Sequence, residues 1–243
     1  VTEISPPWGR AEAALRNRGL SGTVRELIDA HGSGRRRVSI HTRRKDGVVT
    51  AGFMAARSHN LLDLDRCPIL VPELEPAFDL ARTIGTKLGD CDVALTALQG
   101  GIDASVRAER KIVAEEHRGL AAFAAKLGVA RFSVNGEVIL TPHTPFATMG
   151  KALVPVPPGS FLQATAEGEE VLARLVCAAV GKSKNVADLF CGCGPFTFRL
   201  AERARVQAFD SERPAIAALN AAARVATGLK PIAATVRDLF REP

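Results

Sequence analysis

The sequence lacks three features: an apolar run long enough to cross a membrane, a leader of positive charge followed by apolar residues, and an internal repeat. A membrane-spanning helix needs about 20 apolar residues in a row, so we expect no membrane partner, and the missing leader argues against export. Cysteine is also scarce, since the chain has five, an odd number without a paired spacing pattern. We therefore expect reduced thiols in a cytoplasmic monomer.

Positive charge is present in excess, and it is concentrated near the N-terminus. The 243 residues have a formal net charge of +6 and are 47% hydrophobic and 24% charged, as in ordinary globular proteins. Clustered arginines attract phosphate backbones in a salt-sensitive way. We therefore favour a nucleic-acid interface over a merely solvated surface for Arg35, Arg36, Arg37, Arg43 and Arg44.

Residues 1–153 are expected to form an α+β domain built on antiparallel hairpins. Alternating apolar residues from Val38 predict a strand, and Asp46-Gly47 is a strong two-residue hairpin signal before a partner strand over 48–54. Further strands are predicted over 59–64, 93–97, 102–106, 129–134 and 137–140, the last two about Asn135-Gly136, and helices over 9–20, 73–88 and 114–127.

Residues 154–243 are expected to form an α/β domain of the Rossmann type. The proline-rich stretch 154–159 cannot be helix or inner strand, because proline lacks the N–H that both need, so it marks a boundary. After it the pattern alternates strand, helix and strand, which indicates a parallel, doubly wound sheet. The predicted strands cover 186–190, 205–210 and 232–238, and the predicted helices cover 167–180 and 214–227.

The stretch Val186–Leu200 indicates a ligand site. A short apolar strand leads through Cys191-Gly-Cys-Gly194 into a helical pattern, which brings backbone N–H groups close to a ligand where glycine permits positive φ. A dinucleotide fingerprint would place glycine or alanine where Thr197 stands, so a nicotinamide dehydrogenase ranks last. The acids that end the next two strands, Asp210 and Asp238, are suited to ribose hydroxyls and to an adenine amino group.

Several short motifs carry a family resemblance. Asp188 begins a D-x-F-x-G-x-G pattern that resembles motif I of class I S-adenosylmethionine-dependent methyltransferases. Together with Pro157–Gln163 and Arg237–Phe240, it resembles the RNA uracil-C5-methyltransferases that make 5-methyluridine in transfer and ribosomal RNA, nearest the 23S rRNA enzymes. The Arg36 hairpin, Gly52-Phe53, Arg57-Ser58-His59 and Cys67-Pro68-Ile69 also look like that family's central domain.

The resemblance implies a fold, a cofactor and a partner. It implies an α+β central domain followed by the first half of a Rossmann-like class I methyltransferase domain, with S-adenosylmethionine as cofactor and RNA, most of all ribosomal RNA, as partner. It places Phe161 beside a flipped target base, for which an aromatic ring offers a stacking surface, with core packing as the alternative. Many members have asparagine where Pro195 stands. The implied cofactor contacts are Gln163, Asp188, Phe190, Gly192, Gly194, Pro195, Asp210 and Asp238.

The cysteines do not predict a metal site. Cys67 matches the last of four cysteines that hold an iron–sulfur cluster in some members, but no cysteine precedes it here, and such a cluster needs four thiolates. We therefore expect no cluster and interpret Cys67 as a buried thiol rather than an orphan ligand. Cys191 and Cys193 form one C-x-C inside a glycine turn, for which packing is the expected role.

The catalytic groups of the family are not found in this sequence. Carbon 5 of uracil is a weak nucleophile, so the family uses a cysteine thiolate that adds to C6 and a base that removes the C5 proton. The resemblance places both groups later in the chain, so we expect the nucleophilic cysteine beyond Pro243 and no catalytic residue before it. We therefore treat the chain as a fragment of a longer enzyme. Two alternatives remain: another class I RNA base methyltransferase, and a non-catalytic RNA-binding protein with a degenerate cofactor fold.

Overall fold

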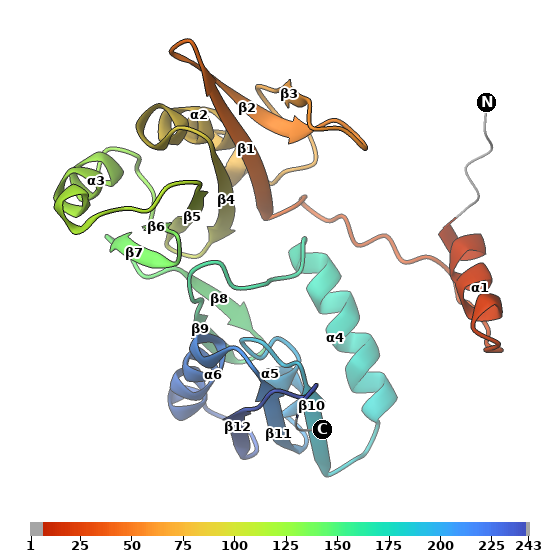
Figure 1. The fold of residues 1–243 in the computed structure, drawn as a ribbon. Helices are drawn as coiled ribbons and strands as arrows, with labels where there is room; N and C mark the ends of the chain where they lie inside the picture. The colour runs from red at the N-terminus through yellow and green to blue at the C-terminus, as the bar shows by residue number, and fades with distance from the viewer. Residues whose placement is uncertain (1–6, 242–243) are drawn as a thin grey trace.

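The computed structural model of the chain describes residues 7–241. These residues include two hydrophobic cores and an N-terminal helix. Figure 1 shows helix α1 (Pro7–Asn17) standing apart, joined to the first core by an extended segment. Gly19, with a φ of 66°, follows α1, where a left-handed glycine ends many helices. The predicted helix over 9–20 is therefore present, displaced slightly toward the N-terminus.

The first core consists of one mixed sheet and two helices. The strands are β1 (Arg37–Lys45), β2 (Val48–Met54), β3 (Leu61–Asp63), β4 (Cys91–Leu98), β5 (Gly101–Ala108), β6 (Arg131–Val134) and β7 (Glu137–Leu140), and the helices are α2 (Ala77–Leu88) and α3 (His117–Ala124). The strand order is β3-β2-β1-β4-β5-β6-β7. Both predicted hairpins form, since Lys45 pairs with Val48 and Val134 with Glu137.

Three details of the first core differ from the sequence expectation. The helix predicted over 73–88 is split into a 3₁₀ turn, Pro72–Leu74, and α2, because Pro76 in a helix interior would clash with the carbonyl four residues earlier. The helix predicted over 114–127 ends at Ala124. The sequence predicted antiparallel hairpins and did not predict the parallel pairing of β5 with β6, which have α3 in the crossover connection between them.

The second core is built around a short parallel sheet, as predicted. Its strands β10 (Asn185–Leu189), β11 (Arg205–Asp210) and β12 (Ile232–Val236) lie in that order, with helices α4 (Ala166–Val180), α5 (Thr197–Leu200) and α6 (Arg213–Val225). Small residues allow α6 to lie close to the sheet, since Ala215, Ala218 and Ala222 are buried beside Leu219. The α/β expectation for this part is confirmed.

A hairpin that the sequence did not predict joins the two cores. Strands β8 (Phe146–Met149) and β9 (Ala152–Pro155) pair with each other, and Phe146 also bridges Gln99 at the end of β4. The hairpin side chains Ala147, Met149 and Val154 are nevertheless buried in the second core. The division of the chain after residue 153 stays a prediction, but the second core already includes residues before it.

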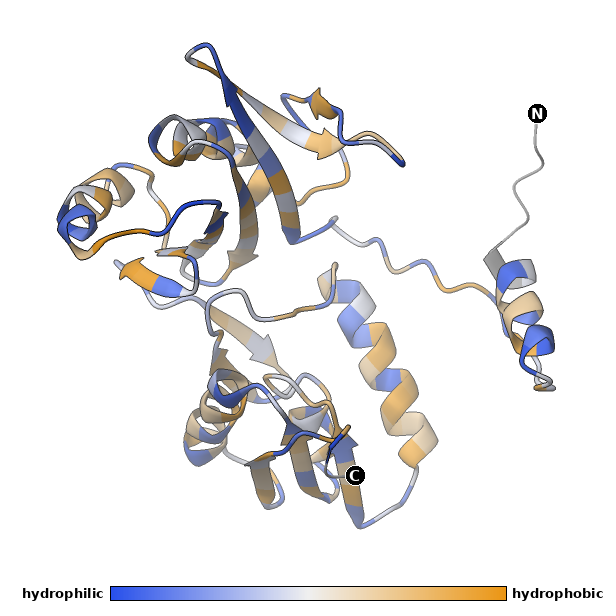
Figure 2. Ribbon diagram, viewed as in Figure 1, coloured by the Kyte–Doolittle hydropathy of each residue, from blue (hydrophilic) through white to orange (hydrophobic). Residues whose placement is uncertain are grey.

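Figure 2 shows apolar residues recurring along helix α4 between polar ones. Its N-terminus is capped by Thr165, whose hydroxyl accepts a hydrogen bond from the Gly168 N–H at 2.9 Å.

No helix within the described residues is long and apolar enough to cross a membrane.

Candidate functional site

The loop after β10 turns through residues with positive φ. Phe190, Gly192 and Gly194 have φ values of 59°, 54° and 93°. A Cβ on Gly192 would meet nothing within 4 Å, whereas a Cβ on Gly194 would lie 2.9 Å from Leu219 Cδ1 and 3.0 Å from Phe198 Cε2. Gly192 therefore leaves open space beside the loop, and Gly194 lets the loop pack onto the second core.

Asp188 stabilises the loop from its buried side. The residue is buried at the end of β10, and the Thr197 hydroxyl donates a hydrogen bond of 2.5 Å to its Oδ2. Burial raises the pKa of the Asp188 carboxyl, although the hydrogen bonds from Thr197 act in the opposite direction. Thr197, which argued against a dinucleotide fingerprint, thus ties the start of α5 to the end of β10.

Asp210 closes the other side of the loop. Its Oδ2 accepts a hydrogen bond from the Gly192 N–H at 2.8 Å, and its Oδ1 accepts one from the Glu212 N–H at 2.9 Å. A carboxylate oxygen has two lone pairs, so each oxygen keeps capacity for a further donor. Asp210 is only partly buried, which makes that capacity accessible to a ligand.

A cavity of about 450 Å³ lies against this loop, and we call it the loop cavity. Its walls come from the segment before α4, the loop after β10, and the turn between β11 and α6. The lining residues are Pro157, Pro158, Gly159, Ser160, Phe161, Gln163, Phe190, Cys191, Gly192, Cys193, Pro195, Phe196, Asp210, Glu212, Pro214 and Ala215.

The structure brings together five of the eight residues that were predicted to contact a cofactor. Gln163, Phe190, Gly192, Pro195 and Asp210 line the loop cavity.

The other three predicted residues do not line the loop cavity. Asp188 and Gly194 lie behind it, as described above. Asp238 follows β12, and its Oδ1 accepts a hydrogen bond from the Phe240 N–H at 3.0 Å. The Phe240 ring lies 5.4 Å from that of Phe190, so this segment reaches the cavity through an aromatic contact.

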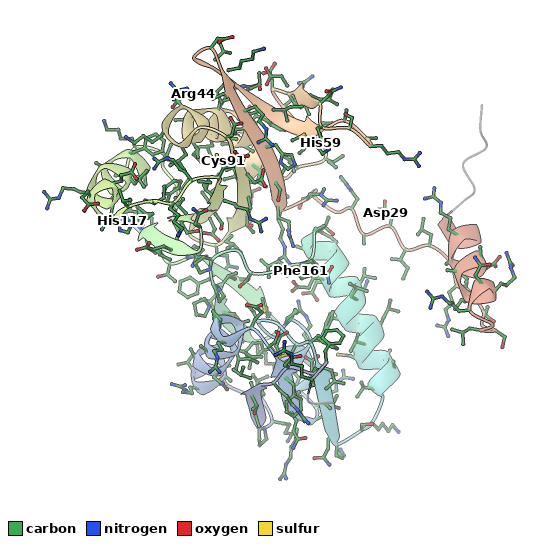
Figure 3. The ribbon with its side chains drawn as sticks, in the orientation of Figure 1. Asp29, Arg44, His59, Cys91, His117 and Phe161 are labelled. Atoms are coloured by element: carbon green, nitrogen blue, oxygen red, sulfur yellow. The ribbon has the colours of Figure 1, made fainter. Side chains whose placement is uncertain are left out.

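A second cavity, of about 500 Å³, lies beside β1, and we call it the arginine cavity. It is lined by Arg35, Arg37, Val38, Ser39, Phe53, Cys67, Ile69, Leu70, Phe161, Leu162, Gln163 and Ala164. Phe161 and Gln163 therefore line both cavities. Figure 3 shows Phe161 between the two cores, and the residue is 71% exposed, so core packing does not account for it.

Arg35 and Arg37 give the arginine cavity its charge. The Arg37 guanidinium lies 4.9 Å from the centre of the Phe161 ring and donates to the Leu162 carbonyl at 2.8 Å. Burial and the neighbouring Arg35 and Arg36 lower the pKa of Arg37. Across residues 7–241, no carboxylate forms an ion pair with Arg35 or Arg37. The cavity therefore holds positive charge that a bound anion would neutralise.

The other three predicted RNA-contacting arginines lie elsewhere. Arg36 is turned into the junction of the cores, where its Nη2 lies 2.6 Å from Glu169 Oε2. Arg43 lies near Asp90, and the Arg44 guanidinium donates to the Thr86 carbonyl. Along β1, Arg44 is seven residues from Arg37, about 23 Å at the usual rise of a strand. The five arginines therefore do not form one patch.

The cysteines of the two cavities are thiols in packed surroundings. Cys191 and Cys193 are buried, and burial is the main cause that raises the pKa of each thiol, so both stay protonated near neutral pH. Cys67 is partly buried against the first core. Among the described residues, no group of three or more His, Cys, Asp and Glu side chains could hold a metal ion. The expected absence of a cluster stays a prediction.

The catalytic nucleophile is expected beyond Pro243, and Pro243 itself lies outside the described residues, which end at Arg241. The structure therefore does not test where the nucleophile lies, and its position stays a prediction. Within the described residues, the cysteines nearest the loop cavity are the buried Cys191 and Cys193. A thiol needs to lose its proton to act as a nucleophile, so neither of these two replaces the expected cysteine.

Several residues of the loop cavity were not predicted from the sequence. Ser160 and Glu212 add polar groups to its wall, and Pro214 and Ala215 add apolar surface. Glu212 could have been found, because it lies in the turn between a predicted strand and a predicted helix, and Pro214 because it begins that helix. Ser160 lies inside the Pro157–Gln163 motif but was not predicted as a contact, and the folded chain shows that it lines the loop cavity.

Comparison with known proteins gives relatives for nearly the whole chain. An uncharacterized RNA methyltransferase of Brucella suis biovar 1 is 41% identical over 234 residues, which cover 95% of this chain and 56% of that protein. A second, from Agrobacterium fabrum, is 38% identical over 236 residues, covering 95% and 57%. A 23S rRNA (uracil(1939)-C(5))-methyltransferase of Cronobacter sakazakii is 30% identical over 214 residues, covering 80% and 48%.

A solved structure shares the fold. The tRNA (uracil-54, C5)-methyltransferase of Pyrococcus abyssi, in complex with S-adenosyl-L-homocysteine, superposes with a TM-score of 0.69 at 17% identity, over 92% of this chain and 59% of that one. No family model matches the chain. The chain spans a little over half the length of the curated relatives it matches, which is consistent with the expectation of a fragment.

Proposed function

We propose, on the premise that this chain is homologous over 95% of its length to bacterial RNA methyltransferases, that the protein methylates carbon 5 of a uridine in RNA. Ribosomal RNA is the first candidate substrate, because a 23S rRNA uracil-C5 enzyme is among the relatives. The observation that carries the proposal is the pair of cavities that share Phe161 and Gln163. A base and a methyl donor must meet at one point, and these two residues provide it.

The residues of the loop cavity fit S-adenosylmethionine, which would supply the methyl group. The open space at Gly192 admits a ligand close to the backbone, and Asp210 keeps acceptor capacity for ribose hydroxyls. Gln163 and the loop around Gly192 would hold the amino-acid end, and Phe190 would cover one side. Asp188 and Gly194 would act by shaping the loop. In this proposal, Asp238 would reach the adenine end together with Phe240.

The residues of the arginine cavity fit a nucleotide. Arg35 and Arg37 would neutralise phosphate, and the exposed ring of Phe161 would stack on a base that has left its helix. We assign Arg36 to the junction of the cores, and Arg43 and Arg44 to more distant contacts with the RNA. Neither Cys191 nor Cys193 is assigned as the nucleophile, because both are buried thiols with raised pKa values.

A calorimetric titration of the 243-residue chain with S-adenosylhomocysteine, with NADH as the comparison ligand, tests the cofactor assignment. We expect binding of the first and not of the second. The variant Asp210→Asn should bind about tenfold more weakly, since one of its two carboxylate acceptors becomes a donor. Asp79→Asn removes an exposed carboxylate of the first core and serves as the charge-matched control. A folded chain that binds neither ligand would favour an RNA-binding module.

Fluorescence anisotropy with a uridine-containing single-stranded RNA tests the second assignment. The double variant Arg35→Ala/Arg37→Ala should lose more affinity than Arg43→Ala/Arg44→Ala, although both remove the same charge. Equal losses would mean that the RNA responds to net charge alone, and the arginine cavity would lose its assignment. Measuring both variants at two salt concentrations separates phosphate attraction from stacking.

A further inference from the structure

A buried carboxylate outside both cavities lies between two arginines. Glu169, in the first turn of α4, has Oε2 at 2.6 Å from Arg36 Nη2 and Oε1 at 3.2 Å from Arg199 Nη2. The Glu169 side chain is 3% exposed, and those of Arg36 and Arg199 are 14% and 9% exposed. Removing one partner from a buried ion pair leaves an uncompensated charge, so the three side chains depend on one another. Arg199 also pairs with the exposed Glu170.

Each of the two arginines also holds a main-chain carbonyl in a cavity wall. Arg36 Nε donates to the Gln163 carbonyl at 3.1 Å, and Arg199 Nη1 donates to the Pro195 carbonyl at 2.5 Å. Gln163 lines both cavities, and Pro195 lines the loop cavity. Hydrogen bonds and ion pairs therefore link the Gln163 carbonyl, before α4, through Glu169 to the Pro195 carbonyl in the loop after β10.

We propose that Glu169 is a positioning residue that fixes the Gln163 segment against the Pro195 loop and so sets the shape of the loop cavity. The guanidinium is a rigid planar fork. When Glu169 holds one nitrogen of Arg36, the direction of the Nε bond to the Gln163 carbonyl is set as well, and the same holds for Arg199 and Pro195. Glu169 acts without touching the ligand. The inference rests on the proposed function, because its test uses a ligand of the loop cavity.

A different interpretation is that Glu169 merely joins the two cores. Both interpretations expect a loss of stability when the carboxylate is removed, so stability cannot separate them. Only a positioning residue changes the affinity of a chain that is still folded. The chain offers a matched control, since Asp103 and Arg131 form another buried pair, with two contacts of 2.8 Å and side chains 5% and 7% exposed. That pair lies in the first core and lines neither cavity.

The test is a titration of the 243-residue chain with S-adenosylhomocysteine, with urea unfolding measured in parallel. Glu169→Gln keeps the side-chain shape but turns one acceptor into a donor that faces a guanidinium, so we expect affinity to fall about tenfold or more. Asp103→Asn should lower the unfolding midpoint without changing the affinity. Equal affinity in wild type and Glu169→Gln, or equal losses in Glu169→Gln and Asp103→Asn, would overturn the inference.

A second variant covers the case in which Glu169→Gln does not fold. Arg36→Lys keeps the charge opposite Glu169, but one ammonium cannot reproduce the two directed bonds of the guanidinium fork. A positioning residue predicts weaker ligand binding in this folded variant, whereas simple charge compensation predicts wild-type affinity and would overturn the inference. If wild type itself binds no S-adenosylhomocysteine, it is the proposed function that fails. The two failures are thereby distinguished.

Discussion

The two cores use the left-handed backbone for different purposes. In the first core, Asp46 and Asn135 adopt positive φ, and each is followed by glycine at a hairpin turn. Aspartate and asparagine tolerate this conformation. In the second core the corresponding residue is Phe190, a bulky side chain with a φ of 59° that is 59% exposed beside the loop cavity. The first core thus closes these two hairpins with residues suited to them, although Arg57 between β2 and β3 also has a positive φ, of 58°. The second core holds a strained aromatic residue where we propose that a ligand binds.

The glycines of the second core divide in the same way between packing and access. Gly194 is enclosed by Leu219 and Phe198, whereas Gly192 has open space at the position of a Cβ. Gly128 of the first core resembles Gly192, with positive φ and nothing within 4 Å, but it lines neither cavity. Substitutions at these three glycines can therefore separate the cost of conformation from the cost of lost binding.

The largest effect is expected for Gly194→Val. The added side chain would overlap Leu219 and Phe198 and would force a β-branched residue to a φ of 93°. Overpacking and backbone strain together should lower the free energy of unfolding by about 3 kcal/mol or more. Urea unfolding followed by circular dichroism measures this. A loss below about 1 kcal/mol would mean that the second core relaxes around the loop.

A smaller effect, on binding rather than packing, is expected for Gly192→Ala. The conformational cost should be about 1 kcal/mol, and it should be the same for the control Gly128→Ala. The methyl group at position 192 would occupy open space of the loop cavity, so affinity for S-adenosylhomocysteine should fall about tenfold in that variant only. Equal affinity in the two variants would contradict the assignment of the loop cavity.

The smallest effect concerns the pH dependence of stability. Burial raises the pKa of Asp188 above its ordinary value of 3.8, so the folded chain holds this proton at pH values at which the unfolded chain has released it. Stability due to Asp188 therefore falls as pH rises from about 3.8 through the folded pKa. The unfolding free energy of wild type relative to Asp188→Asn should decline over this window. A difference that rises with pH would show that the Thr197 hydrogen bond outweighs burial.

The sequence was sufficient where local chemistry decides the structure. Asp46-Gly47 and Asn135-Gly136 close both predicted hairpins, and the parallel order of the second sheet follows from its strand-helix-strand pattern. It was insufficient for the hairpin β8–β9. Its strands are only four residues each, and burial of Ala147, Met149 and Val154 in the second core stabilises them. That burial is a tertiary contact, which no local sequence pattern predicts.

The sequence likewise predicted some residues of the candidate site and not others. Sequence motifs predicted three of the residues that line the loop cavity, Gln163, Gly192 and Asp210. The sequence could not distinguish Arg36, which is turned inward, from its neighbours Arg35 and Arg37, because the three are adjacent on the chain. Nor could it identify Glu169 as the buried acid among several at the start of α4. Such distinctions depend on contacts between residues more than 100 positions apart.

The sharing of Phe161 and Gln163 by two cavities has a thermodynamic consequence. A ligand that displaces either residue on one side changes the wall of the other cavity, and hence the affinity of a second ligand there. Linkage requires the effect to be reciprocal, with the same factor in both directions. Cooperativity between two ligands can thus arise from one short segment of the chain, without any movement of the two sheets.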